Sequence, residues 1–141
     1  MLQHFSKIVY ADYYALMQVT YFPWDYKIID GCVDLIQNND VDLVMAVNRV
    51  TAKDRKLFWY GDKSNVVPWQ SPWLQGSDFE EKVFLENGSC YVFGRDSLSN
   101  AVTLNDFKKV IPYVCDNDYI DIDYREDLLE ARKMYRSIKD G

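Results

Sequence analysis

The sequence YYALMQVTYFPWDYKIIDGCVDLIQNNDVDLVMAV (residues 13–47) determines the fold class, because it reads as a strand, a helix and a second strand. Tyr13–Thr20 is a mostly apolar run that is typical of a buried strand. Asp25 can cap a helix from Tyr26 to about Asn38, whose apolar residues recur at helical spacing. Leu43–Val47 is an unbroken apolar strand of the kind found where helices cover both faces of a sheet. The stretch therefore predicts a right-handed βαβ unit and an α/β fold.

Length and composition predict one globular domain over residues 1–141, with 48% apolar and 16% aromatic residues to form its core. The net charge of −6 and the lack of a basic run argue against nucleic acid or an anionic membrane as a partner. Three widely spaced cysteines, Cys32, Cys90 and Cys115, fit neither a disulfide framework nor a zinc site. The N-terminus lacks the apolar run of a signal peptide and no run is long enough to span a bilayer, so we expect a soluble, cytoplasmic protein.

Aromatic residues are concentrated between Asn48 and Glu86, where short strands alternate with turn residues. Leu57–Tyr60 and Val66–Trp69, joined by the turn residues GDKSN, predict a β-hairpin. Both of its faces are apolar, and a two-stranded hairpin cannot bury aromatic side chains on both faces by itself. Contact with the rest of the domain or with a second subunit is therefore expected for Phe58, Trp59, Trp69 and Trp73. Residues 54–86 thus form an arm that needs a partner, and the family resemblance given below implies that this partner is a second subunit, so that the arm is a dimerisation arm and the protein a homodimer.

A short acidic and apolar segment, DYIDIDYREDL (residues 118–128), leads into the last expected helix, Tyr124–Ile138. If its two isoleucines face a core, Asp121 and Asp123 project together from the opposite face of a strand. Carboxylate oxygens placed in this way can share a hard cation such as Mg²⁺. Asp123 also has capping-box spacing to Glu126 at the start of the helix. These residues by themselves are consistent with metal binding and with simple helix capping.

Three motifs along the chain resemble those of one enzyme family. The motif IDIDYREDLLEA (residues 120–131) resembles the closing motif of the acylneuraminate cytidylyltransferases, the CMP-sialic acid synthetase family. Leu16–Thr20 is similar to that family's Leu-Gln-Pro-Thr-Ser-Pro signature, and Phe84–Phe93 to its aromatic-x-x-Asn-Gly-x-x-Tyr-Ile motif. The resemblance implies a truncated nucleotide-diphospho-sugar transferase-like (Rossmann-like) fold, a three-layer sheet with an aromatic β-hairpin arm that exchanges across a dimer.

The resemblance also implies a substrate site and a reaction, the transfer of CMP from CTP to a keto sugar acid with release of pyrophosphate. The residues that it assigns to the sugar site are Gln18, Thr20, Asn87 and Tyr91, and those that it assigns to the catalytic Mg²⁺ are Asp121 and Asp123. On the residues alone, Gln18 and Thr20 are polar groups where a strand enters a loop, and Asn87–Gly88 is an ordinary tight turn.

The sequence departs from the family in one large feature. These enzymes begin with another βαβ segment, whose glycine- and arginine-rich loop binds the triphosphate, whereas the six glycines here are scattered and none lies in a basic loop. We therefore expect the chain alone to bind CTP weakly. Three interpretations remain: a cytidylyltransferase-like enzyme that needs a separate N-terminal half, a non-catalytic homologue that binds a keto sugar acid or CMP-sugar or only dimerises, and a small α/β domain that binds a divalent ion or a partner protein.

Overall fold

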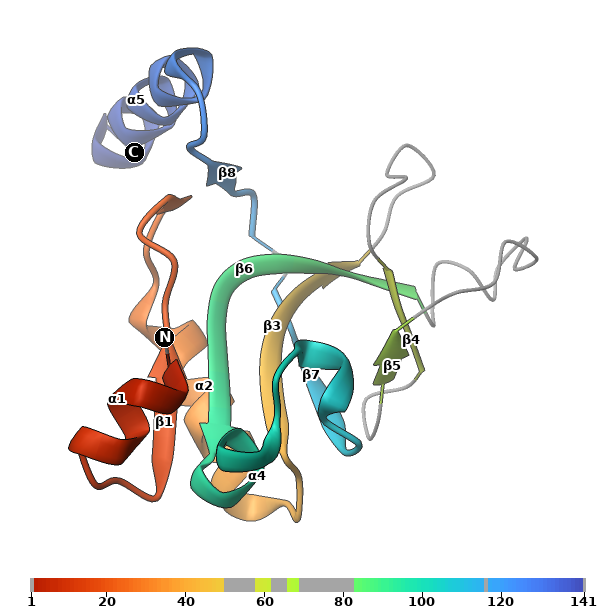
Figure 1. Ribbon diagram of the computed structural model, residues 1–141. Coiled ribbons are helices and arrows are strands. Elements are labelled where there is room, and N and C mark those ends of the chain that lie inside the picture. The colour runs from red at the N-terminus through yellow and green to blue at the C-terminus, as the bar shows by residue number, and fades with distance from the viewer. Residues whose placement is uncertain (1, 50–57, 62–65, 69–82, 116, 141) are drawn as a thin grey trace.

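The computed structural model describes residues 2–49, 58–61, 66–68, 83–115 and 117–140, which form a mixed α/β fold (Figure 1). Its main sheet has the order β5-β4-β6-β3-β7, and β1 pairs with the end of β6 opposite to β4. The strands of this sheet are β1 (Tyr13–Leu16), β3 (Leu43–Arg49), β4 (Phe58–Gly61), β5 (Val66–Pro68), β6 (Val83–Gly94) and β7 (Val110–Val114). The other elements are α1 (Leu2–Ile8), β2 (Tyr21–Phe22), α2 (Tyr26–Asn38), α4 (Arg95–Asn100), the 3-10 helix η1 (Leu104–Asp106), β8 (Ile120–Asp121) and α5 (Arg125–Asp140).

Strand β3 lies inside the sheet and directs alternate side chains to its two faces. Leu43, Met45 and Val47 belong to a hydrophobic cluster that includes side chains of α4, and Val44 and Ala46 belong to a second cluster with α2. All five side chains are fully buried, and burial of one such aliphatic side chain stabilises a fold by about 1.5–3 kcal/mol. Helices therefore cover both faces of the sheet, which confirms the three-layer α/β architecture expected from the sequence.

The strand, helix and strand expected within residues 13–47 are confirmed as β1, α2 and β3. Asp25 caps α2, because its side chain accepts a hydrogen bond from the backbone N–H of Lys27 at 2.9 Å. β1 ends at Leu16, earlier than expected. β1 and β3 both run antiparallel to β6, which lies between them. The two strands are thus parallel to each other without being neighbours.

Strand β6 is one curved strand, so the tight turn expected at Asn87–Gly88 is wrong (Figure 1). Tyr91 pairs with Met45 and Glu86 pairs with Val47, so four residues of β6 lie opposite one residue of β3. Extra residues of this kind form a β-bulge, and Gly88 provides the positive φ of 77° that the bulge contains. The bulge bends β6 where it passes the end of β1.

The expected hairpin is confirmed as the antiparallel strands β4 and β5. β4 also pairs with Val83–Leu85 of β6, so the hairpin extends the main sheet beyond the bulge (Figure 1). Trp69 and Trp73 of the expected arm, residues 54–86, lie outside the described residues. The dimerisation arm and the homodimer therefore stay predictions.

The segment after β7 does not form the core strand that we expected from the sequence. β8 is only two residues long and pairs with β2 in a separate small sheet, which sets Asp121 opposite Tyr21. The ring of Tyr21 is buried and stacks on the ring of Tyr119 at a centroid distance of 5.1 Å. The chain before α5 is therefore fixed to the body of the domain by aromatic packing and by a short ladder rather than by the main sheet.

Helix α5 is confirmed close to its expected position, but its cap and its packing differ from the expectation. The Asp127 side chain accepts hydrogen bonds from the backbone N–H groups of Asp123 at 3.1 Å and Tyr124 at 2.7 Å, so Asp127 caps the helix in place of Glu126. The helix stands apart from the main sheet (Figure 1). Of the apolar stripe that we expected to pack onto the sheet, Ala131 is buried and three members are exposed: Leu128, Tyr135 and Ile138.

Asp42 anchors the helical layer that carries α4 and η1. Its carboxylate accepts hydrogen bonds from the Ser97 hydroxyl at 2.8 Å and from the backbone N–H groups of Lys108 and Lys109 at 3.1 and 3.0 Å. Burial alone would raise the pKa of Asp42, but these hydrogen bonds and the charge of Lys109 hold that pKa below its ordinary value. The ionised carboxylate therefore joins the start of β3 to the segments on both sides of η1.

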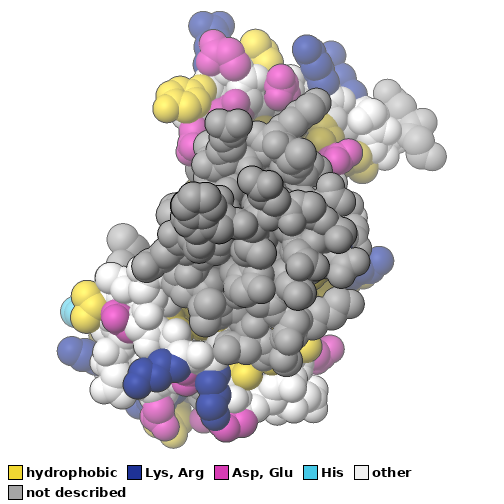
Figure 2. Space-filling model, turned by 90° about the vertical axis from the view of Figure 1, so that its right-hand side faces the viewer, with side chains coloured by type: hydrophobic (Ala, Val, Ile, Leu, Met, Phe, Trp, Pro, Cys, Tyr) yellow, Lys and Arg dark blue, Asp and Glu magenta, His cyan; other side chains and the backbone are white. Residues whose placement is uncertain are grey.

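On the face that Figure 2 shows, acidic and basic side chains of the described residues are interspersed instead of being gathered into one patch. Within the described part of the chain, no helix is both long and apolar enough to cross a bilayer.

Candidate functional site

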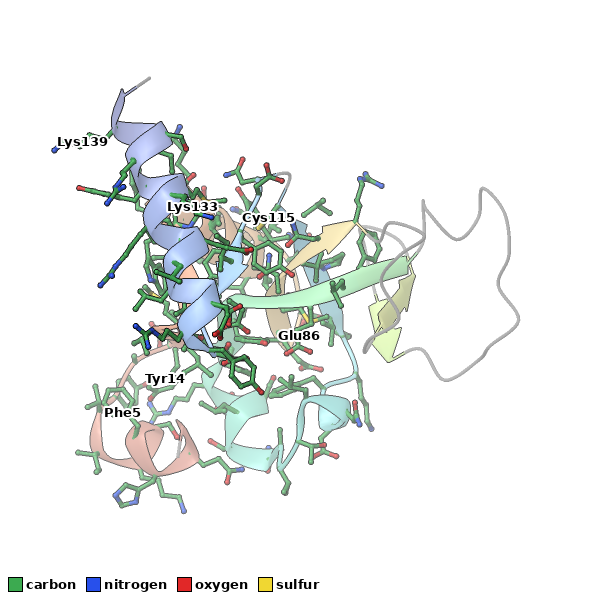
Figure 3. All side chains as sticks on the ribbon, turned by 90° about the horizontal axis from the view of Figure 1, so that it is seen from above. Phe5, Tyr14, Glu86, Cys115, Lys133 and Lys139 are labelled. Atoms are coloured by element: carbon green, nitrogen blue, oxygen red, sulfur yellow. The ribbon has the colours of Figure 1, made fainter. Side chains whose placement is uncertain are left out.

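A cavity of about 590 Å³ lies on the sheet face that α1 and α4 cover. Its walls are mostly apolar and come from β1, β6, α1 and the segment from α4 to η1. Glu86 lies on β6 and Phe5 on α1, both labelled in Figure 3. The polar side chains of the described lining are Gln3, Gln18, Glu86, Tyr91 and Thr103. A concave apolar site with a few polar groups is typical of small-molecule binding.

Tyr91 and Glu86 form a hydrogen-bonded pair in this cavity, in which the tyrosine hydroxyl donates to the glutamate carboxylate. Burial raises the pKa of Tyr91 well above its ordinary value, and the hydrogen bond and charge of Glu86 and the charge of Asp121 raise it further. Tyr91 is therefore a phenol at neutral pH and acts as a hydrogen-bond donor.

Gln18 reaches the cavity from the loop between β1 and β2 and lies directly against the bulge of β6. A Cβ atom added to Gly88 would stand 2.5 Å from Oε1 of Gln18, closer than nonbonded heavy atoms approach. Gly88 therefore serves two purposes, because it adopts the positive φ of the bulge and leaves space for the Gln18 amide. Of the residues that the sequence assigned to the sugar site, the structure brings Gln18 and Tyr91 together in one cavity.

Asn87 lies in the bulge, and its side chain is part of a buried polar network. It donates to Oδ1 of Asn48 at 2.7 Å and accepts from the backbone N–H and the hydroxyl of Ser89 at 3.0 and 2.8 Å. Asn48 in turn donates to the carbonyl of Cys115 at 3.0 Å. Asn87 is not among the described residues that line the cavity. In the structure it fixes the bulge that carries Glu86 and Gly88.

Tyr21 extends this network toward β8. Its hydroxyl is hydrogen-bonded to Ser89, and burial raises its pKa to about 12, with smaller contributions from neighbouring groups. Thr20 contributes through its backbone, because its carbonyl accepts a hydrogen bond from the N–H of Ile122 at 2.9 Å. The loop that carries Gln18 is therefore connected on one side to the bulge and on the other side to the segment that carries Asp121.

Asp121 and Asp123 are both exposed, and their backbone differs from the strand that we expected. β8 ends at Asp121, and the N–H of Asp123 bonds to the carbonyl of Asp121 at 3.2 Å, so the chain turns between them. The alternation of a strand therefore does not apply to this pair. In the described residues, no cluster of three or more His, Cys, Asp or Glu side chains is placed to hold a metal ion. Carboxylates are the ligand type that Mg²⁺ uses, and nucleotide sites need only one or two of them beside the phosphates, so each of the two exposed aspartates stays a candidate ligand.

Three polar residues of the described lining were missed by the sequence analysis: Gln3, Thr103 and Glu86. Glu86 is the charged one of the three. Its signal was present, since it is an acidic residue in the otherwise apolar run that opens β6. An acidic residue in such a run can equally mark the solvent face of a strand. The pairing of Glu86 with Val47 of β3 places it on the face that lines the cavity.

Of the comparisons with known proteins, the one with solved structures supports the architecture. No protein-family model matches the chain, and no curated protein sequence matches it. Among solved structures, CMP:2-keto-3-deoxy-manno-octonic acid synthetase complexed with CTP matches with a TM-score of 0.68 and 12% identity, over 98% of this chain and 67% of that one. This chain has the nucleotide-diphospho-sugar transferase-like fold.

Two further solved structures have the same nucleotide-diphospho-sugar transferase-like fold. HddC from Yersinia pseudotuberculosis complexed with GMP-PN matches with a TM-score of 0.60 and 15% identity, over 95% of this chain and 60% of that one. A putative glucose-1-phosphate thymidylyltransferase from Bacillus anthracis in complex with sucrose matches with a TM-score of 0.66 and 11% identity, over 96% of this chain and 59% of that one. The chain thus spans about three fifths to two thirds of the length of the proteins that it matches. At these identities the likeness extends to the fold, and the chemistry has to be argued from the cavity.

Proposed function

We propose that this chain binds a sugar or sugar nucleotide and belongs functionally with the sugar nucleotidyltransferases. The observation that carries the proposal is the convergence of Gln18, Glu86 and Tyr91, from two separate segments, on one apolar cavity. An amide, a carboxylate and a phenol provide hydrogen-bond donors and acceptors that match sugar hydroxyl groups, and the aromatic and aliphatic walls suit the C–H face of a sugar ring. The solved structures with this fold include a synthetase complexed with CTP and HddC complexed with GMP-PN, which supports the same class.

The finer form of the proposal is transfer of CMP from CTP to a keto sugar acid. It is supported by the three motifs of the sequence and by the likeness to an octonic acid synthetase complexed with CTP. The anomeric hydroxyl of the sugar would attack the α-phosphate of CTP and release pyrophosphate. Mg²⁺ bound by Asp121 and Asp123 would neutralise phosphate charge. Gln18 and Tyr91 would orient the sugar, and orientation supplies much of the rate in phosphoryl-type transfer, which needs little covalent help.

A second candidate is sugar binding without turnover. The sequence has no glycine-rich basic loop, and no lysine or arginine lines the cavity among the described residues. A triphosphate needs backbone amides and cations to compensate for its desolvation. Under this alternative the chain recognises a sugar acid or CMP-sugar, as a homodimer or together with a separate chain that supplies the CTP site.

Calorimetric titration of the full chain with CTP and with CMP-N-acetylneuraminic acid, each with Mg²⁺, tests the proposal and separates its two forms. Binding of the CMP-sugar supports the proposed class. If the chain also binds CTP, and releases pyrophosphate when N-acetylneuraminic acid is supplied, the result favours the enzyme. If it binds the CMP-sugar but not CTP, the result favours the non-catalytic form. If the chain binds neither nucleotide nor the free sugar acid, the proposed function is wrong.

The metal role has its own test. We expect Asp121→Asn to weaken Mg²⁺ binding in the presence of CMP-N-acetylneuraminic acid by at least about tenfold, because one of two hard oxygen ligands loses its charge. Asp118→Asn, which alters an exposed carboxylate in the same segment, is the matched control and should bind as the parent does. Equal Mg²⁺ affinity in the Asp121→Asn variant and the parent would eliminate Asp121 as a ligand.

A further inference from the structure

We propose that the ligand of the cavity carries an apolar substituent larger than an acetyl group, and that this substituent occupies the end of the cavity formed by α1, α4 and η1. The inference rests on the proposed function, since it assumes that the rest of the ligand is a sugar. It specifies the substrate class further: a sugar whose apolar group, such as a pentanoyl chain, lies away from the carbon that receives the nucleotide.

The cavity has a polar end and an apolar end, which lie at different points along β6. Glu86 and Tyr91 flank the bulge of β6, and Gln18 lies against Gly88 of the same bulge. Figure 1 shows β6 running from its bend near β8 to α4. Along this direction the next lining residue of β6 is Phe93, whose ring stacks on that of Tyr91 at a centroid distance of 6.3 Å. The lining therefore changes from polar to aromatic between the bulge and α4.

The apolar end has both a buried floor and exposed walls. The rings of Phe93 and Phe107 are buried in the floor, with centroids 5.4 Å apart. Phe5 of α1 and Val102 after α4 also line the cavity, yet they are 49% and 88% exposed. A ligand group placed here would remove apolar surface from water, and each buried methylene group strengthens binding by about fourfold. The other apolar side chains of this end are Leu98, Ala101 and Leu104.

Two polar side chains also line the cavity near α1 and η1, but both are hydrogen-bonded within the fold. The Gln3 amide donates to the carbonyl of Ala101 at the end of α4. The Thr103 hydroxyl donates to Oδ2 of Asp106 at 3.2 Å. By contrast, within the described part of the chain the Gln18 amide has no hydrogen-bond partner. The sugar hydroxyl groups are therefore better matched by the bulge end, which leaves the α4 end for an apolar group.

The polar end also lies toward the segment that would hold the metal and the phosphates. The Gln18 carbonyl accepts a hydrogen bond from the N–H of Tyr21 at 3.4 Å, and Tyr21 pairs with Asp121 in the β2–β8 ladder. Under the proposed function the nucleotide would be transferred at this end. The apolar substituent would then project from a part of the sugar that is distant from the anomeric carbon, as an N-acyl group does in a neuraminic acid.

Two neuraminic acids that differ only in the length of the N-acyl chain form a matched pair of probes. We expect the full chain to bind N-pentanoylneuraminic acid at least about tenfold more tightly than N-acetylneuraminic acid, as measured by calorimetry. Equal affinities would overturn the inference and leave the proposed function standing. If neither acid binds, the inference fails, and the proposed function fails with it only if CMP-N-acetylneuraminic acid does not bind either. The two failures are thus distinguishable.

N-Methylpentanamide, which is the substituent without the sugar, tests whether the cavity recognises an apolar group alone. We expect it to bind at least about tenfold more weakly than N-pentanoylneuraminic acid, because it lacks the hydroxyl groups that would bond to Gln18 and Tyr91. A comparable affinity of the two compounds would overturn the inference, since the sugar would then add nothing to binding.

The Phe5→Ala variant tests the placement of the substituent, because it removes an exposed aromatic wall of the apolar end. We expect the affinity for N-pentanoylneuraminic acid to fall at least about threefold, whereas that for N-acetylneuraminic acid changes little. Ile8→Ala, at an exposed position of the same helix outside the described lining, is the control and should keep the parent ratio.

The ratio of the two affinities separates contact with the substituent from general damage to the cavity, because such damage would weaken both probes equally. An unchanged ratio in Phe5→Ala would overturn the placement at the α1 end. The ratio in the parent chain tests the preference for a larger acyl group even if the Phe5→Ala variant fails to fold.

Discussion

Gly88 is a position on which the polar side of the cavity depends. It has a φ of 77°, a conformation that costs a residue with a side chain about 1–2 kcal/mol. A methyl group there would also stand 2.5 Å from Oε1 of Gln18. The Gln18 side chain is flexible and would move away, so this contact costs little folding energy but displaces the amide from the cavity.

We therefore expect Gly88→Ala to lower the free energy of unfolding by about 1–2 kcal/mol and also to weaken sugar binding, measured by urea denaturation and by titration with CMP-N-acetylneuraminic acid. The control is Gly94→Ala. At Gly94, φ is −67° and an added Cβ would have its nearest contact at 3.7 Å, so stability and binding should change little. Equal effects at the two glycines would contradict this account of the bulge.

At the level of elements, the cap of α5 is a local feature with a clear test. Asp127 accepts hydrogen bonds from two backbone N–H groups at the start of the helix, and within the described residues the neighbouring Glu126 carboxylate accepts no such bond. We expect Asp127→Ala to destabilise the first turn of α5 by about 0.5–2 kcal/mol, seen as faster amide hydrogen exchange there. Glu126→Ala removes a charge at the adjacent position and should leave exchange nearly unchanged. If Glu126→Ala speeds amide hydrogen exchange more than Asp127→Ala does, the capping box of Asp123 and Glu126 that the sequence suggested would be supported instead.

The sequence predicted those elements whose signals are local. The cap at Asp25, the helical periodicity after it and the apolar run of β3 each act within a few residues, and all three appear in the structure. The bulge at Asn87–Gly88 was mistaken for a turn because an Asn-Gly pair suits both. The pairing of β6 with β1 and β3, strands that are distant in the sequence, decides that Asn87–Gly88 forms a bulge and not a turn.

The cavity shows the same division between local and distant signals. Gln18 and Tyr91 were named from motifs, and the fold brings them together. Glu86 was missed because its place in the cavity depends on the pairing of β6 with Val47 of β3, a residue that is distant in sequence. Ile120 and Ile122 suggested a core strand, but the aromatic stacking of Tyr21 on Tyr119 holds that segment in a separate small sheet. Tertiary packing therefore determined which apolar residues reached the core.

At the scale of the whole molecule, the arrangement of the sheet bears on oligomerisation. β4 pairs with β6 beyond the bulge, so the β4–β5 hairpin extends the sheet away from β1 and α2 (Figure 1). Trp59 lies on β4, and Trp69 directly follows β5 in the sequence. Tryptophan is enriched at the energetic centres of interfaces, where truncation of one residue typically costs about 2 kcal/mol or more. An aromatic hairpin at this end of the sheet is therefore suited to contact a second subunit.

We expect the parent chain to sediment as a dimer and the double variant Trp59→Ala with Trp69→Ala to sediment with half that mass, because two anchors are lost from each side of a symmetric interface. Trp24→Ala is the matched control, since Trp24 is partly exposed in the loop before α2, far from the hairpin in the sequence, and its loss should leave the dimer intact. A double variant that keeps the dimer mass would place both tryptophans inside the subunit. A parent chain that sediments as a monomer would remove the dimerisation arm altogether, while the cavity, which is built from residues of one chain, would keep its ligand.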